Sequence, residues 1–262
     1  MPFREQNSNK GTFGKVLNFA GSKNYIGAAY LSTVSVLKSG AGFAALASEK
    51  EIIRSVSTLL PEAVYLSHKE GLKQIKDFSV VLIGCGLGNN KKLFQEVIKH
   101  VKSPLVIDAD GLNILSKLNI TLPKNTMITP HPLEAARLLG VELQDILSDL
   151  ESSAKKLCEK YNCITVLKTH RTIICDGKEI FINQHGNSAL AKAGSGDVLA
   201  GIIAGLLAQK VQPYNAARLG VYLHSRAGEI ASEELTEYSV LASDLPKYLP
   251  EAIKQTLSCQ SD

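Results

Sequence analysis

The stretch of this 262-residue chain with the clearest chemical potential runs from Asn187 to Ala208. A loop of small residues, Gly194-Ser195-Gly196, leads directly into Asp197, and an apolar segment with the character of a buried helix follows. Glycines let a backbone approach a ligand closely, and the first turn of a helix presents unpaired N–H groups with partial positive charge. The loop and helix start therefore predict a phosphate site, with Asp197 placed to take a proton from a substrate hydroxyl.

Asp197 has a second explanation, because aspartate also caps the N-termini of helices. A carboxylate beside a helix start is expected to stay ionised, which suits proton abstraction from a hydroxyl that is about to be phosphorylated. The other polar motifs that follow predicted strands favour the catalytic role of Asp197 over simple capping.

A basic segment, Lys168-Thr169-His170-Arg171-Thr172, follows another apolar stretch that is typical of a strand. The Lys168 ammonium and the Arg171 guanidinium are suited to contact phosphate oxygens. The alternative is a solvated basic turn without a ligand.

A histidine, His131, lies between two prolines that restrict the backbone on both sides. Such a histidine at a strand end can hydrogen-bond a ligand, although a lone histidine is also commonly structural. Glu134 comes three residues later on the same face of an expected helix. It is placed to hold His131 or a metal-bound water, or to stabilise the first turn.

Two carboxylates, Asp108 and Asp110, follow a further buried strand, together with Asn113. They could organise Mg²⁺ through water, or they could cap the helix that begins near Leu112. The glycine-rich turn Gly84–Gly88 would allow a sugar or phosphate to approach the backbone, or it is merely a tight turn.

The elements that must position these residues follow an alternating pattern of strands and helices, which predicts an α/β domain with a mostly parallel sheet. Ligands bind such sheets beyond the carboxyl ends of the strands, where all of these motifs fall. No linker or repeat divides the chain, so we expect one domain over residues 1–262 with a polar lead at 1–13. The expected strands are 15–20, 42–47, 63–66, 79–83, 104–107, 126–128, 163–167, 172–175 and 179–183. The expected helices include 28–38, 49–58, 91–101, 142–161, 198–208, 214–234 and 245–257.

Net charge, the length of apolar runs and the cysteine pattern limit the classes of partner and the environment that we expect for this chain. The net charge is +4 and no basic run is present, so we expect no nucleic acid and no membrane surface as a partner. The longest uncharged apolar run, 198–208, is about half as long as a membrane span requires. The five cysteines form no CxxC pair and no zinc spacing, so we expect reduced thiols in a cytosolic protein. They are Cys85, Cys158, Cys163, Cys175 and Cys259.

Taken together and in this order, the motifs resemble the ADP/ATP-dependent NAD(P)H-hydrate dehydratases, a branch of the ribokinase-like superfamily. The resemblance covers about residues 11–250, and Thr129-Pro130-His131-Pro132-x-Glu134 separates this branch from sugar and vitamin kinases. It implies a three-layer α/β/α sandwich. It also implies a repair reaction, in which the S epimer of hydrated NADH or NADPH (NADHX, NADPHX) is phosphorylated at its C6 hydroxyl and then loses phosphate to restore the ring double bond.

The resemblance also implies roles for individual residues. Asp197 would be the catalytic base, and the Gly194–Gly196 amides would hold the transferring phosphate together with Mg²⁺. No direct metal ligand is assigned, and Asn187, Glu134, Asp108, Asp110 and Asn113 would support the site. The hydrated dinucleotide would contact Ala29, Gly86, His131 and Asp197, and the nucleotide would contact Lys168, Thr169, His170, Arg171, Thr172 and Gly196.

Two positions depart from the family pattern. Leu133 stands where the family usually has glycine, and Thr169 stands where it usually has glycine after the lysine. Each is expected to add a side chain next to a ligand. ADP is favoured over ATP as the phosphate donor. A homo-oligomer, often a tetramer, and an epimerase acting on the same hydrate are the partners that the family implies.

Two other functions are compatible with these motifs. A small-molecule kinase of the same superfamily, of the hydroxyethylthiazole or hydroxymethylpyrimidine type, would use the same Gly-Ser-Gly-Asp machinery and leave a stable phosphorylated product. A non-catalytic nucleotide sensor would have no use for Asp197.

Overall fold

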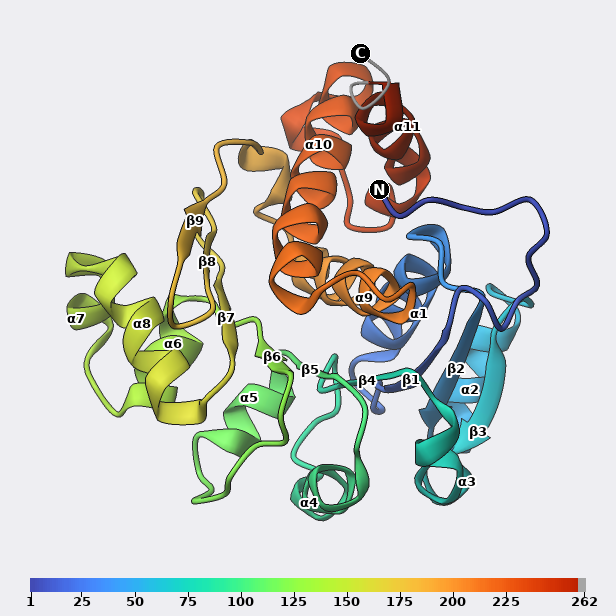
Figure 1. Cartoon of the computed structure of the whole chain (residues 1–262), viewed down its shortest axis with the longest axis horizontal. Helices are drawn as coiled ribbons and strands as arrows, with labels where there is room; N and C mark the ends of the chain where they lie inside the picture. Colours follow the sequence, from blue (N-terminus) through green and yellow to red (C-terminus); the bar gives the residue numbers. More distant parts are fainter. Residues whose placement is uncertain (259–262) are drawn as a thin grey trace.

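The computed structural model describes residues 1–258 and contains a nine-stranded sheet with helices on both faces (Figure 1). The strand order is β3-β2-β1-β4-β5-β6-β7-β8-β9. All neighbours from β3 to β7 are parallel, whereas β8 pairs antiparallel with both β7 and β9. The predicted mostly parallel α/β sheet is therefore confirmed. The strands are β1 (Lys15–Phe19), β2 (Phe43–Ser48), β3 (Val64–Ser67), β4 (Val80–Ile83), β5 (Leu105–Ile107), β6 (Thr126–Ile128), β7 (Ile164–Leu167), β8 (Ile173–Cys175) and β9 (Ile180–Ile182).

Helices cover both faces of the sheet because its strands are apolar on both sides. On β1, for example, Val16 packs into the hydrophobic cluster on one face and Leu17 into the cluster on the other. The first cluster includes α1 (Ile26–Lys38), α2 (Lys50–Ser57), α9 (Ser195–Ala208), α10 (Pro213–Ser239) and α11 (Leu245–Ser258). The second includes α4 (Lys91–His100), α5 (Asp110–Leu115), α6 (Pro132–Leu139), α7 (Leu143–Ser148) and α8 (Leu150–Tyr161). The short helix α3 (His68–Gln74) lies against β1, β2 and β3 beside α4.

The helix that carries the predicted phosphate loop, α9, packs unusually closely against α1. A Cβ at Gly201 would lie 2.2 Å from the carbonyl oxygen of Ser32, and a Cβ at Gly205 would lie 1.9 Å from Ser39 Oγ. Only glycine fits such distances, so the two backbones approach each other directly. This contact fixes the position of α9 relative to the sheet.

One expectation about helices is wrong, and one helix was not predicted. The expected single helix over 142–161 is divided into α7 and α8, because Asp149 leaves the helical conformation with φ −151° and ψ 86°. Asp149 Oδ1 accepts a hydrogen bond from the Ser152 amide at 3.0 Å and so begins a new helix. Helix α3 was not expected, although Ser67 and Glu70 form a capping box that its sequence spacing signals.

Four cysteines, Cys85, Cys158, Cys163 and Cys175, are buried free thiols, as expected, and Cys259 lies outside the described residues. Within residues 1–258, no helix combines the length and apolar character that crossing a membrane would need.

Candidate functional site

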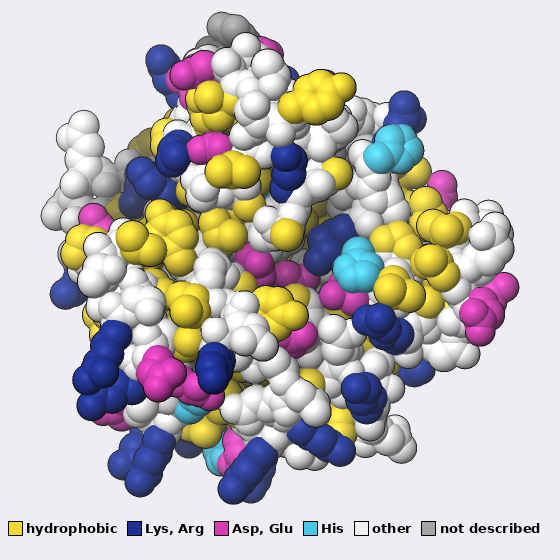
Figure 2. All heavy atoms as spheres, turned by 180° about the vertical axis from the view of Figure 1, so that it is seen from behind, with side chains coloured by type: hydrophobic (Ala, Val, Ile, Leu, Met, Phe, Trp, Pro, Cys, Tyr) yellow, Lys and Arg dark blue, Asp and Glu magenta, His cyan; other side chains and the backbone are white. Residues whose placement is uncertain are grey.

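A cleft of about 800 Å³ brings most of the predicted site residues together. It lies where Asp108 follows β5, His131 follows β6 and Lys168 follows β7, opposite the N-terminus of α9. Figure 2 shows a hollow near the centre of one face, with acidic side chains inside it and basic and histidine side chains beside it. The predicted residues that line the cleft are Asp108, His131, Glu134, Lys168, Thr169, His170, Thr172, Asn187, Gly194, Ser195, Gly196 and Asp197.

The loop before α9 has the backbone geometry of an open helix start. Gly194 is the N-cap residue with φ +92°, a conformation that favours glycine. No side chain caps this helix, and Asp197 lies within its first turn rather than at the cap. The capping explanation of Asp197 is therefore not what the structure shows. The first-turn N–H groups of α9 lie at the cleft without a side-chain partner from a cap, as an anion site requires.

Lys168 is a partly buried cation rather than a solvated one. Its ammonium donates a hydrogen bond to Asp108 Oδ1 at 2.6 Å and lies 3.9 Å from Glu134 Oε2. Burial acts to lower the pKa of Lys168, but the Asp108 and Glu134 carboxylates outweigh it, so the pKa lies above its usual value. Thr129 Oγ1 also donates to Asp108 Oδ1, at 2.7 Å. Asp108 thus holds a charged Lys168 at the floor of the cleft.

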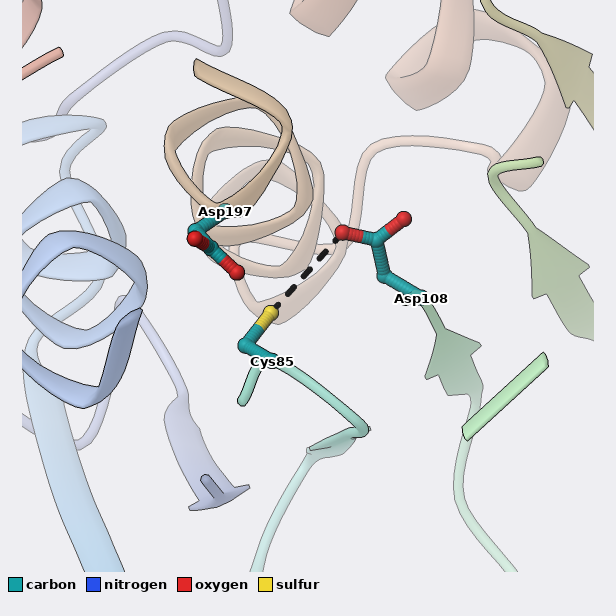
Figure 3. Close-up of side chains that lie close together, drawn as sticks. All are labelled: Cys85, Asp108 and Asp197. Atoms are coloured by element: carbon teal, nitrogen blue, oxygen red, sulfur yellow. Dashed lines mark hydrogen bonds between the residues drawn. The ribbon is translucent and has the colours of Figure 1, made fainter. Parts of the chain in front are cut away.

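Asp197 faces Asp108 and the thiol of Cys85 (Figure 3). One ligand-type atom of each residue lies within 4.8 Å of the others, and Cys85 Sγ is 4.0 Å from Asp108 Oδ2. Burial, followed by the charge of Asp108, raises the pKa of Asp197 to about 7. The expectation that the helix start keeps Asp197 fully ionised is therefore wrong, because desolvation outweighs the helix dipole. A pKa near neutrality suits a general base.

Cys85 stays a thiol in these surroundings. Its side chain is fully buried, and burial together with the Asp197 and Asp108 charges raises its pKa well above the usual value. A protonated thiol can donate one weak hydrogen bond to a carboxylate. Cys85 therefore separates two acidic side chains without adding a third negative charge.

His131 and Glu134 form the start of α6. Glu134 Oε2 accepts a hydrogen bond from the His131 amide at 2.9 Å, and His131 Nδ1 accepts one from the Leu133 amide at 3.2 Å. The His131 proton is then on Nε2, which lies 3.4 Å from Glu134 Oε1. Burial and the Lys168 charge lower the pKa of His131, while burial raises the pKa of Glu134 to about 7. Glu134 thus both holds His131 and stabilises the first turn, which are two of the three roles that the sequence left open.

Several predicted residues lie outside this lining. Ala29 is fully buried, Gly86 is buried against Tyr25 and Ala28, and Arg171 is exposed. Asp110 Oδ2 accepts a hydrogen bond from the Gly88 amide at 2.8 Å, and Asn113 Oδ1 accepts one from Arg137 at 2.8 Å. These last two side chains support the turn after β4 and the α5–α6 contact.

The two positions that depart from the family pattern have different surroundings. Leu133 is exposed on α6 and is not part of the cleft lining. Thr169 lines the cleft, and its Oγ1 donates to the Arg171 carbonyl at 2.6 Å. Of these two residues, only Thr169 thus adds a side chain to the cleft.

The segment 185–192 forms a cleft wall of which the sequence predicted only Asn187. It is fastened to α10: Gly186 N–H donates to Glu229 Oε1 at 2.5 Å, and Asn187 Nδ2 donates to Ser232 Oγ at 2.7 Å. The other lining residues not predicted are Ala109, His185, Gly186, Ser188, Leu190, Ala191, Lys192, Leu199, Val221, His224 and Ser225. His185 and Gly186 could have been found, because they adjoin the predicted Asn187, whereas His224 and Ser225 give no local signal.

The model of the NAD(P)H-hydrate dehydratase family matches residues 16–251 of this chain. The chain belongs to this family. Among the dehydratases, an ADP-dependent (S)-NAD(P)H-hydrate dehydratase of Bacillus subtilis is 32% identical, over 97% of this chain and 94% of that protein. A protein of the same description from Neisseria meningitidis is 36% identical, over 88% and 81%.

Solved dehydratase structures have the same fold. A Bacillus subtilis ADP/ATP-dependent NAD(P)H-hydrate dehydratase, co-crystallised with ATP and Mg²⁺, aligns with a TM-score of 0.88 at 31% identity and covers 97% of this chain and 94% of its own. The ribokinase-like fold is thereby confirmed. A hydroxyethylthiazole kinase of Pyrococcus horikoshii, at 16% identity and a TM-score of 0.63 over 92% and 89%, shares the fold alone.

Longer members of the dehydratase family also match. The bifunctional NAD(P)H-hydrate repair enzyme of Vibrio cholerae is 36% identical over 97% of this chain but only 52% of its own length. The chain thus spans about half the length of these bifunctional relatives.

Proposed function

We propose that this protein catalyses the nucleotide-dependent dehydration of S-NADHX and S-NADPHX to NADH and NADPH, with ADP favoured over ATP. The family relationship supports the substrate class. The single observation that carries the chemistry is the half-buried Asp197 carboxylate, with a pKa of about 7, in the first turn of a helix whose preceding loop, Gly194–Gly196, lines the same cleft as Lys168.

The reaction begins with Asp197 taking the proton of the C6 hydroxyl. The hydroxyl oxygen then forms a bond to the terminal phosphorus of the nucleotide, whose bond to the bridging oxygen breaks, so that ADP leaves as AMP or ATP leaves as ADP. The first-turn amides of α9 and the Lys168 ammonium stabilise the charge of the transferring group. In the second half, phosphate departs from C6 with the electrons of the C6–O bond, the electrons of a C5–H bond form the ring double bond, and the C5 proton passes to the departing phosphate or to solvent.

Magnesium is the metal that phosphate-transfer chemistry implies, and the similar Bacillus subtilis dehydratase was co-crystallised with ATP and Mg²⁺. The donor set near Asp197 tests the fit: the carboxylates of Asp108 and Asp110 offer the oxygen atoms that Mg²⁺ prefers, whereas the Cys85 thiol does not. Since Asp108 Oδ1 already accepts two hydrogen bonds, these side chains would hold the ion through its water shell. When bound, Mg²⁺ supplies charge neutralisation for the nucleotide phosphates.

We also propose that residues 1–262 form one domain and that the protein is a cytosolic homo-oligomer, with a tetramer favoured. An epimerase that acts on the same hydrate is its proposed partner. Sedimentation at several protein concentrations measures the assembly. A monomer at all concentrations would contradict the tetramer without affecting the proposed chemistry.

The decisive assay follows the near-ultraviolet absorbance of NADPH as purified protein, NADPH hydrate and Mg²⁺ are mixed with ADP or ATP in parallel. We expect absorbance to rise only with nucleotide, faster with ADP, together with release of inorganic phosphate. A phosphorylated product that keeps its phosphate would instead identify a small-molecule kinase. A folded protein that binds nucleotide without turning over the hydrate would support the sensor alternative.

A further inference from the structure

One buried histidine of α10 contacts the loop Gly194–Gly196 that precedes and begins α9. His224 is only 7% exposed, yet it borders the cleft. Its Nε2 atom lies 3.0 Å from the carbonyl oxygen of Ser195 and 3.0 Å from Ser195 Oγ. Ser195 is the first residue of α9, so this imidazole contacts the turn on which the proposed phosphate site depends.

The carbonyl contact determines which ring nitrogen of His224 carries the proton. A carbonyl oxygen can only accept a hydrogen bond, so a distance of 3.0 Å requires Nε2 to be the donor. Burial lowers the pKa of His224 to about 4, so the ring is neutral at physiological pH. Neutral imidazole with the hydrogen on Nε2 is therefore the form that faces Ser195.

This tautomer determines the direction of the second hydrogen bond as well. Nε2 carries a single hydrogen, so Ser195 Oγ can only share it with the Ser195 carbonyl as a second acceptor, which leaves the hydroxyl hydrogen to be donated elsewhere. Within residues 1–258, that hydroxyl has no hydrogen-bond partner besides His224. Ser195 is 5% exposed and lines the cleft, so the remaining acceptor must come from a bound molecule or water.

Other positively polarised groups lie at the same place. Gly196 follows Ser195, and a Cβ on Gly196 would lie 3.2 Å from Lys168 Nζ. The Lys168 ammonium, the first-turn amides of α9 and the Ser195 hydroxyl therefore belong to residues that line the same cleft. An anion with several oxygens is the ligand that such a set of donors recognises.

We propose that His224 is a positioning residue that holds Ser195 through Nε2–H, so that the Ser195 hydroxyl donates a hydrogen bond to a phosphate oxygen of the bound nucleotide. The inference rests on the proposed function in one respect, namely that the anion is a nucleotide phosphate. His224 does not touch the reacting atoms and acts through Ser195.

Calorimetric titration with ADP and Mg²⁺, in the absence of hydrate, tests this arrangement. His224→Leu removes the donor at similar volume, His224→Gln can place an amide N–H near the position of Nε2, and Ser195→Ala removes only the hydroxyl. We expect about tenfold weaker binding for the Leu and Ala variants, the usual effect of losing one hydrogen bond to a charged group, and near-native binding for Gln.

The double variant His224→Leu/Ser195→Ala sharpens the test. Because both changes remove the same hydrogen bond to phosphate, the double variant should bind ADP about as weakly as either single variant. In turnover assays the loss should appear in the KM for nucleotide rather than in the KM for the hydrate. Rescue by Gln with this selective KM effect is not expected of a residue that only fills space.

Three results would overturn the proposal: native affinity in His224→Leu, equal weakening in the Gln and Leu variants, or fully additive losses in the double variant. Thermal unfolding checks that each variant is folded. If the Leu variant does not fold, Ser195→Ala decides, because unchanged ADP affinity in that variant also overturns the proposal. A wild-type protein that binds ADP but regenerates no NADPH would contradict the proposed function while leaving this inference standing.

Discussion

Two glycine-rich turns of this protein look alike in sequence and differ in what occupies the space beside their glycines. In the turn Gly84–Gly88, a Cβ on Gly84 would lie 2.0 Å from the carbonyl oxygen of Asp108, so the protein's own backbone occupies that space. In Gly194–Gly196, a Cβ on Gly194 would also be crowded, at 2.6 Å from Leu31 Cδ1, but a Cβ on Gly196 would meet the Lys168 ammonium at 3.2 Å, and the turn lines the cleft. The first turn packs the fold, and the second faces a ligand site.

The comparison teaches that glycine content alone does not identify a phosphate loop. Gly86 is enclosed by Tyr25 and Ala28 in the structure, and its predicted contact with the hydrated dinucleotide remains a prediction. A turn offers its amides to a ligand when a helix with an uncapped start follows it and when no other part of the chain covers it. In this comparison only the turn before α9 precedes an uncapped helix and lines the cleft, although Gly194 itself packs against Leu31 and Ala242.

The largest effect should come from Asp197, the proposed catalytic base that follows the second turn. Asp197→Asn keeps the size of the side chain and removes the base, so we expect turnover to fall by about 10³-fold. ADP affinity should change little, because the amides and Lys168 remain. The absorbance of NADPH measures turnover, and calorimetric titration measures ADP affinity. Retained NADPH formation in the variant would contradict the role of Asp197.

Alanine in each turn tests the comparison directly. Gly84→Ala places a Cβ against backbone at φ +122°, and we expect a loss of about 3 kcal/mol or a failure to fold. Gly196→Ala lies within a helix and meets only the flexible end of Lys168, so its thermal midpoint should stay near that of the wild type while its nucleotide KM rises. Equal destabilisation of the two variants would abolish the distinction between the turns.

The pH dependence of activity should report the second turn as well. Asp197 must be ionised to act as a base, and its pKa is raised to about 7. We therefore expect kcat/KM for the hydrate to fall about tenfold per pH unit below that value. A rate profile that is flat across neutral pH would contradict this assignment of the base.

The raised pKa of Asp197 affects activity and stability in opposite directions, because activity rises with pH while the free energy of unfolding falls. Between the ordinary carboxyl value of 3.8 and about 7, the folded protein retains a proton on Asp197 that the unfolded chain has lost, so Asp197 makes the folded state less stable as pH rises through this window. Glu134, also raised to about 7, acts in the same direction. Asp197→Asn should unfold about 4 °C higher than the wild type in mildly alkaline buffer, with a smaller difference in acid.

The smallest effect should come from a residue that is near the cleft in sequence but not part of it. Leu133→Gly restores the usual family residue on the exposed face of α6. We expect a loss of about 1 kcal/mol from the lower helix propensity of glycine, and KM values within about twofold of the wild type. A large fall in the hydrate KM would show that Leu133 contacts substrate.

Much of the fold follows from local sequence patterns. The buried strands are continuous apolar runs, and the rule that ligands bind beyond the carboxyl ends of parallel strands predicts that Asp108, His131 and Lys168 share one cleft, as they do in the structure. The break at Asp149 was missed because the amphipathic pattern continues through it, although aspartate is a good N-cap.

The parts of the site that were not predicted depend on contacts between distant elements. The pKa of Asp197 is determined by burial and by Asp108, which comes from another strand end, so no property of the Gly-Ser-Gly-Asp motif reveals it. His224 lies within a long helix, and its importance depends on how α10 meets the first turn of α9. Local sequence thus identified the loop, and tertiary packing determines its protonation and hydrogen bonding.

The close fit of α9 against α1 has a consequence for how the proposed phosphate site is held. With Gly201 and Gly205 set against Ser32 and Ser39, a side chain at either glycine would force α9 away from α1. A methyl group at Gly201 would therefore shift the first-turn amides of the same helix relative to Lys168, although Gly201 does not line the cleft. The phosphate site would then lose affinity through a change in helix position, with every residue that lines the cleft still present.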